Sequence, residues 1–216
     1  MLKSYYTIKE NGIHEIDIKK SRFITNMARV TNEAAAKTFI QKIKKEHYQA
    51  THNCSAFIIG EQNEIQRAHD DGEPSGTAGV PMLESLKLMA LQNVVAVTTR
   101  YFSGIKLGAG GLIRAYSNSV SEAAHAIGIV RGTLQRALNF HLAYNQIDLV
   151  QNYFDNSTYQ IDDIQYTTDI AITAFIDSQD IAQIKADLTD LLNGQIQFEV
   201  GTERFREVLV NSNQSH

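Results

Sequence analysis

Cysteine, proline and long apolar runs are scarce in this chain of 216 residues. Its single cysteine, Cys54, rules out an intrachain disulfide and argues against a redox function. No stretch approaches the roughly 18 consecutive apolar residues of a membrane-spanning helix. Residues 1–6 also lack the apolar core of a secretion signal. The sequence therefore predicts a cytoplasmic protein that does not associate with a membrane.

Glycine, by contrast, is concentrated in one part of the chain. Eight of the 13 glycines and both prolines lie in residues 60–111, around the runs DDGEPSGTAG (70–79) and RYFSGIKLGAGG (100–111). Glycine weakens helices and strands, so it collects where the backbone turns with positive φ or lies against a ligand. The clustering predicts two loops that build a recognition surface.

The net charge of −4 is unevenly distributed. Residues 1–132 carry 16 Lys and Arg against 12 Asp and Glu, a net +4, whereas residues 133–216 carry 4 against 12, a net −8. The first part can attract phosphates and the second repels them, so nucleic-acid contact is expected in the first part alone. The alternative is that the acidic side chains of the second part only keep the protein soluble.

Hydrophobic periodicity predicts an α+β unit over residues 1–132. The expected strands lie around residues 16–18 and at 23–30, 54–59, 64–69 and 94–99, and the expected helices follow Asn32, cover 83–91, and run from Gly111 to Gly128. Asn32 is a good N-cap, and Gly128 is suited to end a helix.

From residue 134 the pattern starts again. Alternating and helical spacings follow one another in the order β-α-β-β-α-β, with the last strand at residues 196–200, which is the ferredoxin-like arrangement. The sequence thus predicts two domains of an α+β protein, residues 1–132 and 133–216.

Two long motifs closely resemble the signature of the IMPACT/YigZ family. They are AHDDGEPSGTAG (68–79) and RYF (100–102) followed by KLGAGGLIRAY (106–116). Ser103 departs from the pattern, because the family commonly has a glycine there. The resemblance covers about residues 1–130, and the part after residue 134 resembles the small C-terminal domain of the bacterial members.

This resemblance implies a first domain with the fold of a ribosomal-protein domain and of domain IV of elongation factor G. It implies a second domain like that factor's C-terminal ferredoxin-like module. Eukaryotic relatives regulate translation by binding a ribosome-associated activator of a stress kinase, and nucleic-acid or ribosome binding is proposed for bacterial members. Fold analogy alone is a weak reason to assign a function, so the residues are weighed separately.

The glycine-rich turn at residues 108–111 opens a helix whose first turn has free amide groups and no acidic side chain. Those amides and the helix dipole favour an anion, and Lys106 and Arg114 flank them with full charges. A nucleotide is conceivable, but neither a Walker sequence nor the dinucleotide fingerprint is present. The alternative is that these glycines only permit tight strand-to-helix packing.

Cations and aromatic rings alternate in the neighbouring run of Arg100, Tyr101 and Phe102. This mixture suits single-stranded RNA, whose bases stack and whose phosphates pair with cations. It suits a protein partner equally well, because Arg and Tyr dominate binding hot spots. The alternative without a ligand has the rings in the core and the arginines paired with acidic residues.

Three carboxylates in the run 70–73 can bind a divalent cation or act as acid and base. The alternative is structural: they neutralise Arg67, Arg100 or Arg114, while Ser75 or Thr77 caps the next helix. Zinc binding by His52, Cys54 and His69 has no second cysteine to support it, so a buried histidine beside a buried thiol is the preferred interpretation.

These observations favour a non-enzymatic binding protein linked to translation, with RNA, the ribosome or a ribosome-associated protein as partner, and without a metal or cofactor. The alternative is a phosphate-handling hydrolase or transferase that uses the glycine-rich loop and the acidic run. The residues assigned to the binding surface are Arg100, Tyr101, Lys106, Gly108, Gly110, Gly111 and Arg114; those assigned to shaping the loops, or alternatively to metal or acid-base chemistry, are Asp70, Asp71, Glu73, Ser75 and Thr77.

Overall fold

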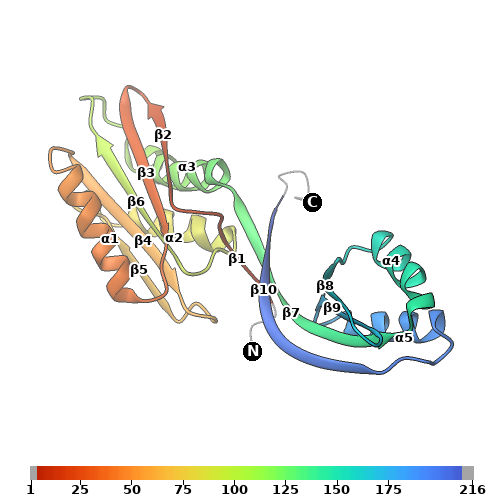
Figure 1. The fold of residues 1–216 in the computed structure, drawn as a ribbon. Coiled ribbons are helices and arrows are strands. Elements are labelled where there is room, and N and C mark those ends of the chain that lie inside the picture. The colour runs from red at the N-terminus through yellow and green to blue at the C-terminus, as the bar shows by residue number, and fades with distance from the viewer. Residues whose placement is uncertain (1–3, 211–216) are drawn as a thin grey trace. The chain divides into compact units, whose positions relative to one another are not determined.

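The computed structural model describes residues 4–210, which form two compact units (Figure 1). The larger unit contains residues 5–132 and 207–210, and the smaller unit contains Thr133–Arg206 together with Ser4. Each unit has its own hydrophobic core of helix and strand residues. The chain is therefore a two-domain α+β protein, as the sequence predicts.

The larger unit is built on an antiparallel sheet of five strands in the order β2-β3-β6-β4-β5. The strands are β2 (Gly12–Ile18), β3 (Ser21–Arg29), β4 (His52–Ile59), β5 (Ile65–His69) and β6 (Val94–Tyr101), and the helices are α1 (Glu33–Glu46), α2 (Gly79–Leu88) and α3 (Ala109–Ile127). Figure 1 shows α1 on one side of this sheet and α2 and α3 on the other.

Strand alternation explains why this sheet is covered on both faces. In β4, Phe57 and Ile59 pack into the core beneath α1, whereas Ala56 and Ile58 pack into the core shared with α2 and α3. Successive residues of a strand point to opposite faces, so an uninterrupted apolar run buries both. The two glycine-rich loops follow β5 and β6 of this sheet.

The helix ends follow the expected capping chemistry in two places and depart from it in a third. The Asn32 side chain accepts the N–H of Ala35 at 2.9 Å, and Gly128 ends α3 with φ of 96°. The expected helix at 83–91 is displaced, because α2 already begins at Gly79 and ends at Leu88.

Two features of the larger unit were not predicted. Strand β1 (Ser4–Ile8) pairs with the long strand β7 (Ile129–Leu142). The turn between β2 and β3 consists of Lys19 and Lys20, both with positive φ. That geometry matches the twist of a two-residue hairpin but is adopted here without glycine or asparagine.

The smaller unit has the element order β-α-β-β-α-β that the sequence predicts. After β7 and a short 3-10 turn come α4 (Ile147–Asp155), β8 (Ile161–Tyr166), β9 (Ile170–Asp177), α5 (Ile181–Leu191) and β10 (Phe198–Leu209). In the sheet, β7 pairs with both β9 and β10, and β9 pairs with β8. The first and last strands are longer than expected, since β10 continues well past residue 200. No helix within residues 4–210 combines the length and apolar character needed to cross a membrane.

Candidate functional site

The two glycine-rich loops meet at a pocket of about 350 Å³ in the larger unit. We call it the α3 pocket, and its lining includes His52, Glu73, Arg100, Phe102, Lys106 and Gly108. These residues come from the start of β4, the loop before α2, the end of β6 and the start of α3. The structure therefore brings parts of both motifs together.

Arg100 lines this pocket but is not water-facing. It is 4% exposed, and its Nη1 donates to Glu73 Oε1 at 2.7 Å. The expectation of an exposed Arg100 is thus corrected, and the structural alternative, in which the acidic run neutralises this arginine, is what the structure shows. Arg100 lies near the end of the central strand β6, where burial of both faces covers the side chain.

The carboxylate of Glu73 is the centre of a buried polar cluster. Its Oε1 also accepts the hydroxyl of Tyr116 at 2.8 Å, and its Oε2 lies 3.7 Å from Nε2 of His52. His52 and Arg100 are directly opposite each other on β4 and β6. Burial raises the pKa of Tyr116, so its hydroxyl remains a proton donor to this carboxylate.

One donor of this cluster has no hydrogen-bond partner. Nε of Arg100 has no hydrogen-bond partner among the described residues, although it is buried. The guanidinium carbon lies 5.4 Å from the ring centre of Phe23 and 5.0 Å from that of Phe102. Aromatic faces stabilise the cation but satisfy no N–H group.

Lys106 and the start of α3 supply the exposed positive charge of the α3 pocket. Lys106 is exposed and forms no ion pair with a described residue. Gly108 is the N-cap with φ of 73°, no side chain caps the helix, and its first turn has no acidic residue. The first N–H groups of α3 therefore keep their capacity to bind an anion.

Arg114 does not belong to this pocket. It is exposed on α3, two residues beyond the pocket residue Leu112. Two residues rotate a helix position by about 200°, so Arg114 faces nearly the opposite way from Leu112. The predicted grouping of Arg100, Lys106 and Arg114 on one surface is therefore wrong in two respects: one is buried and another points away.

Tyr101 and Phe102 also separate. The Tyr101 hydroxyl bonds to Nδ1 of His47 at 2.9 Å, and Arg22 lies over its ring, so Tyr101 is occupied away from the α3 pocket. Phe102 lines the pocket and is 41% exposed. Alternation along β6 explains the difference, because Arg100 and Phe102 are two residues apart and Tyr101 lies between them.

Asp70 organises the loop before α2. Its carboxylate accepts the N–H groups of Gly76, Ala78 and Gly79 at 2.8–3.1 Å. Burial acts to raise the pKa of Asp70, but the three backbone donors outweigh it and the pKa is lowered. Asp70 thus satisfies the orphan amides at the start of α2.

Neither serine nor threonine of this loop caps α2, contrary to one expectation. Thr77 is buried and donates its hydroxyl to the carbonyl of Pro74 at 2.6 Å, whereas Ser75 is exposed. The N-cap position is Ala78, whose side chain has no acceptor. Thr77 therefore shapes the loop rather than the helix end.

Asp71 points in a different direction from both of its acidic neighbours. It accepts Lys44 Nζ at 2.6 Å and the backbone N–H of Asn53 at 2.6 Å. Burial opposes ionisation, but Lys44 and Asn53 together hold the pKa of Asp71 below its usual value. Among residues 4–210, no group of three or more His, Cys, Asp or Glu side chains is arranged to hold a metal ion.

Cys54 and His52 are separately engaged by the backbone of the acidic run. The Cys54 thiol donates to the carbonyl of Asp70 at 2.9 Å, and His52 Nδ1 lies 2.9 Å from the carbonyl of Asp71. Burial raises the pKa of Cys54 to about 12, which keeps the thiol protonated at neutral pH. The geometry gives this thiol a packing role and offers no nucleophile.

The glycines of the two motifs serve different purposes. A Cβ on Gly79 would lie 2.5–2.9 Å from the backbone of His69, so close packing requires glycine there. A Cβ on Gly110 would meet nothing within 4 Å, and its φ is ordinary. Neither strain nor packing therefore explains Gly110, which leaves the space above the first turn of α3 open.

Both units match families of known proteins. Residues 19–124 match the family described as Impact N-terminal domain, and residues 140–195 match the Domain of unknown function (DUF1949). The chain is 48% identical over 211 residues to the IMPACT family member YvyE of Bacillus subtilis, covering 98% of this chain and 97% of the relative. IMPACT family member YigZ of Escherichia coli is 33% identical over 183 residues, covering 84% and 90%.

A solved structure described as "Crystal structure of an hypothetical protein" has a TM-score of 0.58 to this chain at 30% identity, covering 94% of this chain and 98% of that one. This likeness extends over both units. The matched domain and the sequence relatives show that the chain belongs to the IMPACT family.

Proposed function

We propose that this IMPACT family member is a non-enzymatic protein that acts on translation by binding single-stranded RNA. The observation that carries the proposal is the lining of the α3 pocket, where the exposed cation Lys106, the uncapped start of α3 and the exposed ring of Phe102 lie together. Phosphate and base are the two parts of a nucleotide, and the pocket offers a surface for each.

The phosphate belongs at the start of α3. Backbone N–H groups at a helix N-terminus point at an anion and the helix dipole favours it, while Lys106 adds a full charge. Gly110 is not part of the pocket lining, but a Cβ there would meet nothing within 4 Å, so the amides of the first turn of α3 are open to a ligand. Because Glu73 already neutralises Arg100, Lys106 is the cation left to pair with the phosphate.

The base belongs on Phe102. Arg100 lies over the ring of Phe102, which fixes the ring without covering all of it. Stacking on an aromatic side chain contributes about 1–3 kcal/mol per base and tolerates any base. The pocket therefore supports binding of a single strand with little sequence preference.

The alternative of a phosphate-handling enzyme receives no such support. Asp70 caps α2, Asp71 binds Lys44, and Glu73 binds Arg100 and Tyr116. Each carboxylate is thus engaged with a different element of the fold. Glu73, the carboxylate that lines the α3 pocket together with Lys106, is already paired with Arg100 and Tyr116.

Salt-dependent RNA binding tests the proposal. The measurement is fluorescence anisotropy of an end-labelled, unstructured RNA with the full chain at increasing salt. Each phosphate contact with single strands contributes about −0.7 to the slope of log K against log salt. Lys106→Ala should weaken binding and make the slope shallower by about that amount, whereas Phe102→Ala should weaken binding about 5- to 150-fold with the slope unchanged.

A second variant separates binding from folding. Gly110→Asp places an acidic side chain in the first turn of α3, where it suits the helix dipole and clashes with nothing, but repels phosphate. Binding should fall while the melting temperature stays the same or rises. The matched control is Asn118→Asp, which adds the same charge about 12 Å further along this helix at an exposed position, and should bind like the natural protein.

Absence of RNA binding at low salt would overturn the proposal, as would binding that Gly110→Asp and Asn118→Asp weaken equally.

Co-sedimentation with ribosomes tests the link to translation. Crosslinking to RNA through the larger unit is expected. Crosslinking only to a ribosomal or ribosome-associated protein would refute RNA as the partner.

A further inference from the structure

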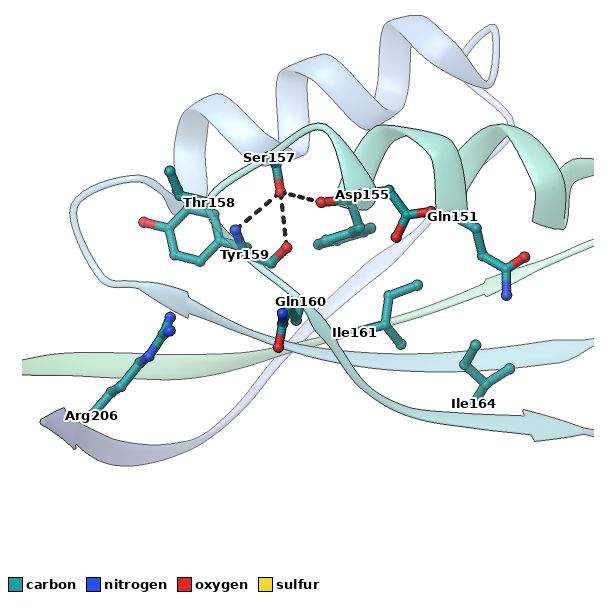
Figure 2. Close-up of a pocket in the computed structure, with 10 residues that line it drawn as sticks. Gln151, Asp155, Ser157, Thr158, Tyr159, Gln160, Ile161, Ile164 and Arg206 are labelled. Carbon is teal, nitrogen blue, oxygen red and sulfur yellow. Dashed lines mark hydrogen bonds between the residues drawn. The ribbon is translucent and has the colours of Figure 1, made fainter. Parts of the chain in front are cut away.

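The smaller unit contains a separate pocket of about 580 Å³ (Figure 2). We call it the α4 pocket. Its walls come from the end of α4, the loop that follows, β8 and Arg206 of β10. A volume of this size is typical of small-molecule sites. Nothing in the proposed RNA function uses it.

Arg206 is the cation of this unit that remains without a partner. The unit's other three Lys and Arg are engaged: Arg136 with Glu203, Arg204 with Asp162, and Lys185 over the ring of Phe198. Among the described residues, Arg206 has neither an ion pair nor an aromatic partner, and it lines the α4 pocket. An arginine that stays unpaired at a pocket, in a part of the chain rich in acidic residues, is available to bind the carboxylate of a ligand.

The wall of this pocket is held in place before any ligand arrives. The Ser157 hydroxyl accepts the N–H of Tyr159 at 3.0 Å and lies 2.9 Å from the carbonyl oxygen of Phe154 (Figure 2). Tyr159 is buried and donates its hydroxyl to Asp180 at the start of α5. A preformed wall lowers the entropy cost of binding.

The charges of the pocket select the ligand. Arg206 on one side is matched by Asp155 at the end of α4, and Figure 2 shows these two side chains apart, with Gln160 between them in the view. A polyanion such as RNA is disfavoured because residues 133–216 carry a net −8. A ligand with one positive and one negative group, and no net charge, satisfies both side chains.

We infer that the α4 pocket binds a small zwitterion of the α-amino acid class. Arg206 takes the carboxylate and Asp155 takes the ammonium group. The amide groups of Gln151 and Gln160 supply further hydrogen bonds, and Ile161 offers apolar surface to the ligand's side chain. The IMPACT family member would thus carry a small-molecule site in one unit and an RNA site in the other.

The test is a titration of the full-length protein with each proteinogenic L-amino acid, followed by isothermal calorimetry and by NMR shifts of residues lining the α4 pocket. At least one free amino acid should bind at millimolar concentration or below. Its N-acetylated form and its carboxamide form should each bind at least about tenfold more weakly, because each removes one charged contact.

Variants locate the binding. Arg206→Gln should weaken it by about 10- to 100-fold. Lys185→Gln removes the same charge from this unit outside the pocket and should leave the affinity unchanged. Circular dichroism verifies that both variants are folded.

The inference is overturned if no amino acid binds at millimolar concentration. It is equally overturned if Lys185→Gln weakens binding as much as Arg206→Gln, or if acetate binds as well as the amino acid. The last result would show a simple anion site in which Asp155 has no role.

Discussion

Glu73→Gln is the sharpest test of how the α3 pocket is held together. The substitution keeps the size of the side chain and removes only its charge. Side chains of Glu73 and Arg100 are 3% and 5% exposed, and the two are joined at 2.7 Å. The variant leaves the Arg100 guanidinium buried without its counter-charge, although the Gln oxygen can still accept from Tyr116.

The expected loss of stability is large. Removing one partner of a buried ion pair costs about 3–5 kcal/mol, chiefly because the other charge remains buried. With a urea m-value near 2 kcal/mol/M, the lower figure moves the unfolding midpoint down by roughly 1.5 M. The double variant Glu73→Gln with Arg100→Met should recover part of this loss, because it leaves no uncompensated charge.

Urea unfolding followed by circular dichroism measures the midpoint. Hydrogen exchange of peptides from β4 and β6 assigns the transition to the larger unit, because two units need not unfold together. The control is Glu15→Gln, which removes a carboxylate paired with Arg22 at 2.7 Å in an exposed position. If Glu73→Gln shifts the midpoint no more than Glu15→Gln, the buried pair does not stabilise the fold as argued.

Three further predictions concern the same unit. Asp70→Asn should destabilise it at neutral pH by about 0.5–2 kcal/mol, as lost helix caps do, measured by urea unfolding. Folding lowers the pKa of Asp70 below 3.8. The stability difference between the natural protein and Asp70→Asn should therefore have its full size above that pH. It should shrink as the pH falls and Asp70 of the natural protein becomes protonated. Cys54 should resist iodoacetamide at pH 8 in the native state and react on unfolding, as mass spectrometry would show; native labelling would contradict its burial. Gly79→Ala should lower the melting temperature through its clash with His69, whereas Gly110→Ala should raise it slightly, and equal effects would refute the distinction drawn between the two glycines.

Much of the fold follows from local patterns in the sequence. The apolar alternation and the caps at Asn32 and Gly128 place most strands and helices near their observed positions. The element order of the smaller unit also follows, because period two and period 3.6 alternate clearly there. These signals are local, so a single sequence suffices to read them.

Features set by tertiary structure were not predictable in this way. Lys19 and Lys20 adopt positive φ because the pairing of β2 with β3 demands a two-residue turn, and no glycine or asparagine announces it. The extra length of β7 and β10 depends on their mutual pairing and on β1. Strand ends of this kind are decided by neighbours rather than by propensity.

The site was predicted in part, and the errors of that prediction share one cause. The sequence indicated the correct loops but treated neighbouring residues as one surface. In a strand, Arg100 and Tyr101 point to opposite faces, and in a helix Leu112 and Arg114 do nearly the same. His52 was not grouped with Arg100, because only the register of β4 against β6 places them opposite each other.

The acidic run shows how a dense motif can be structural and still define a site. Its three carboxylates bind three different parts of the larger unit: the start of α2 for Asp70, α1 through Lys44 for Asp71, and β6 through Arg100 for Glu73. Carboxylates that are already paired within the fold are not available to bind a ligand. The chemistry left open at the α3 pocket is therefore cationic and aromatic, which is why we propose RNA binding rather than catalysis.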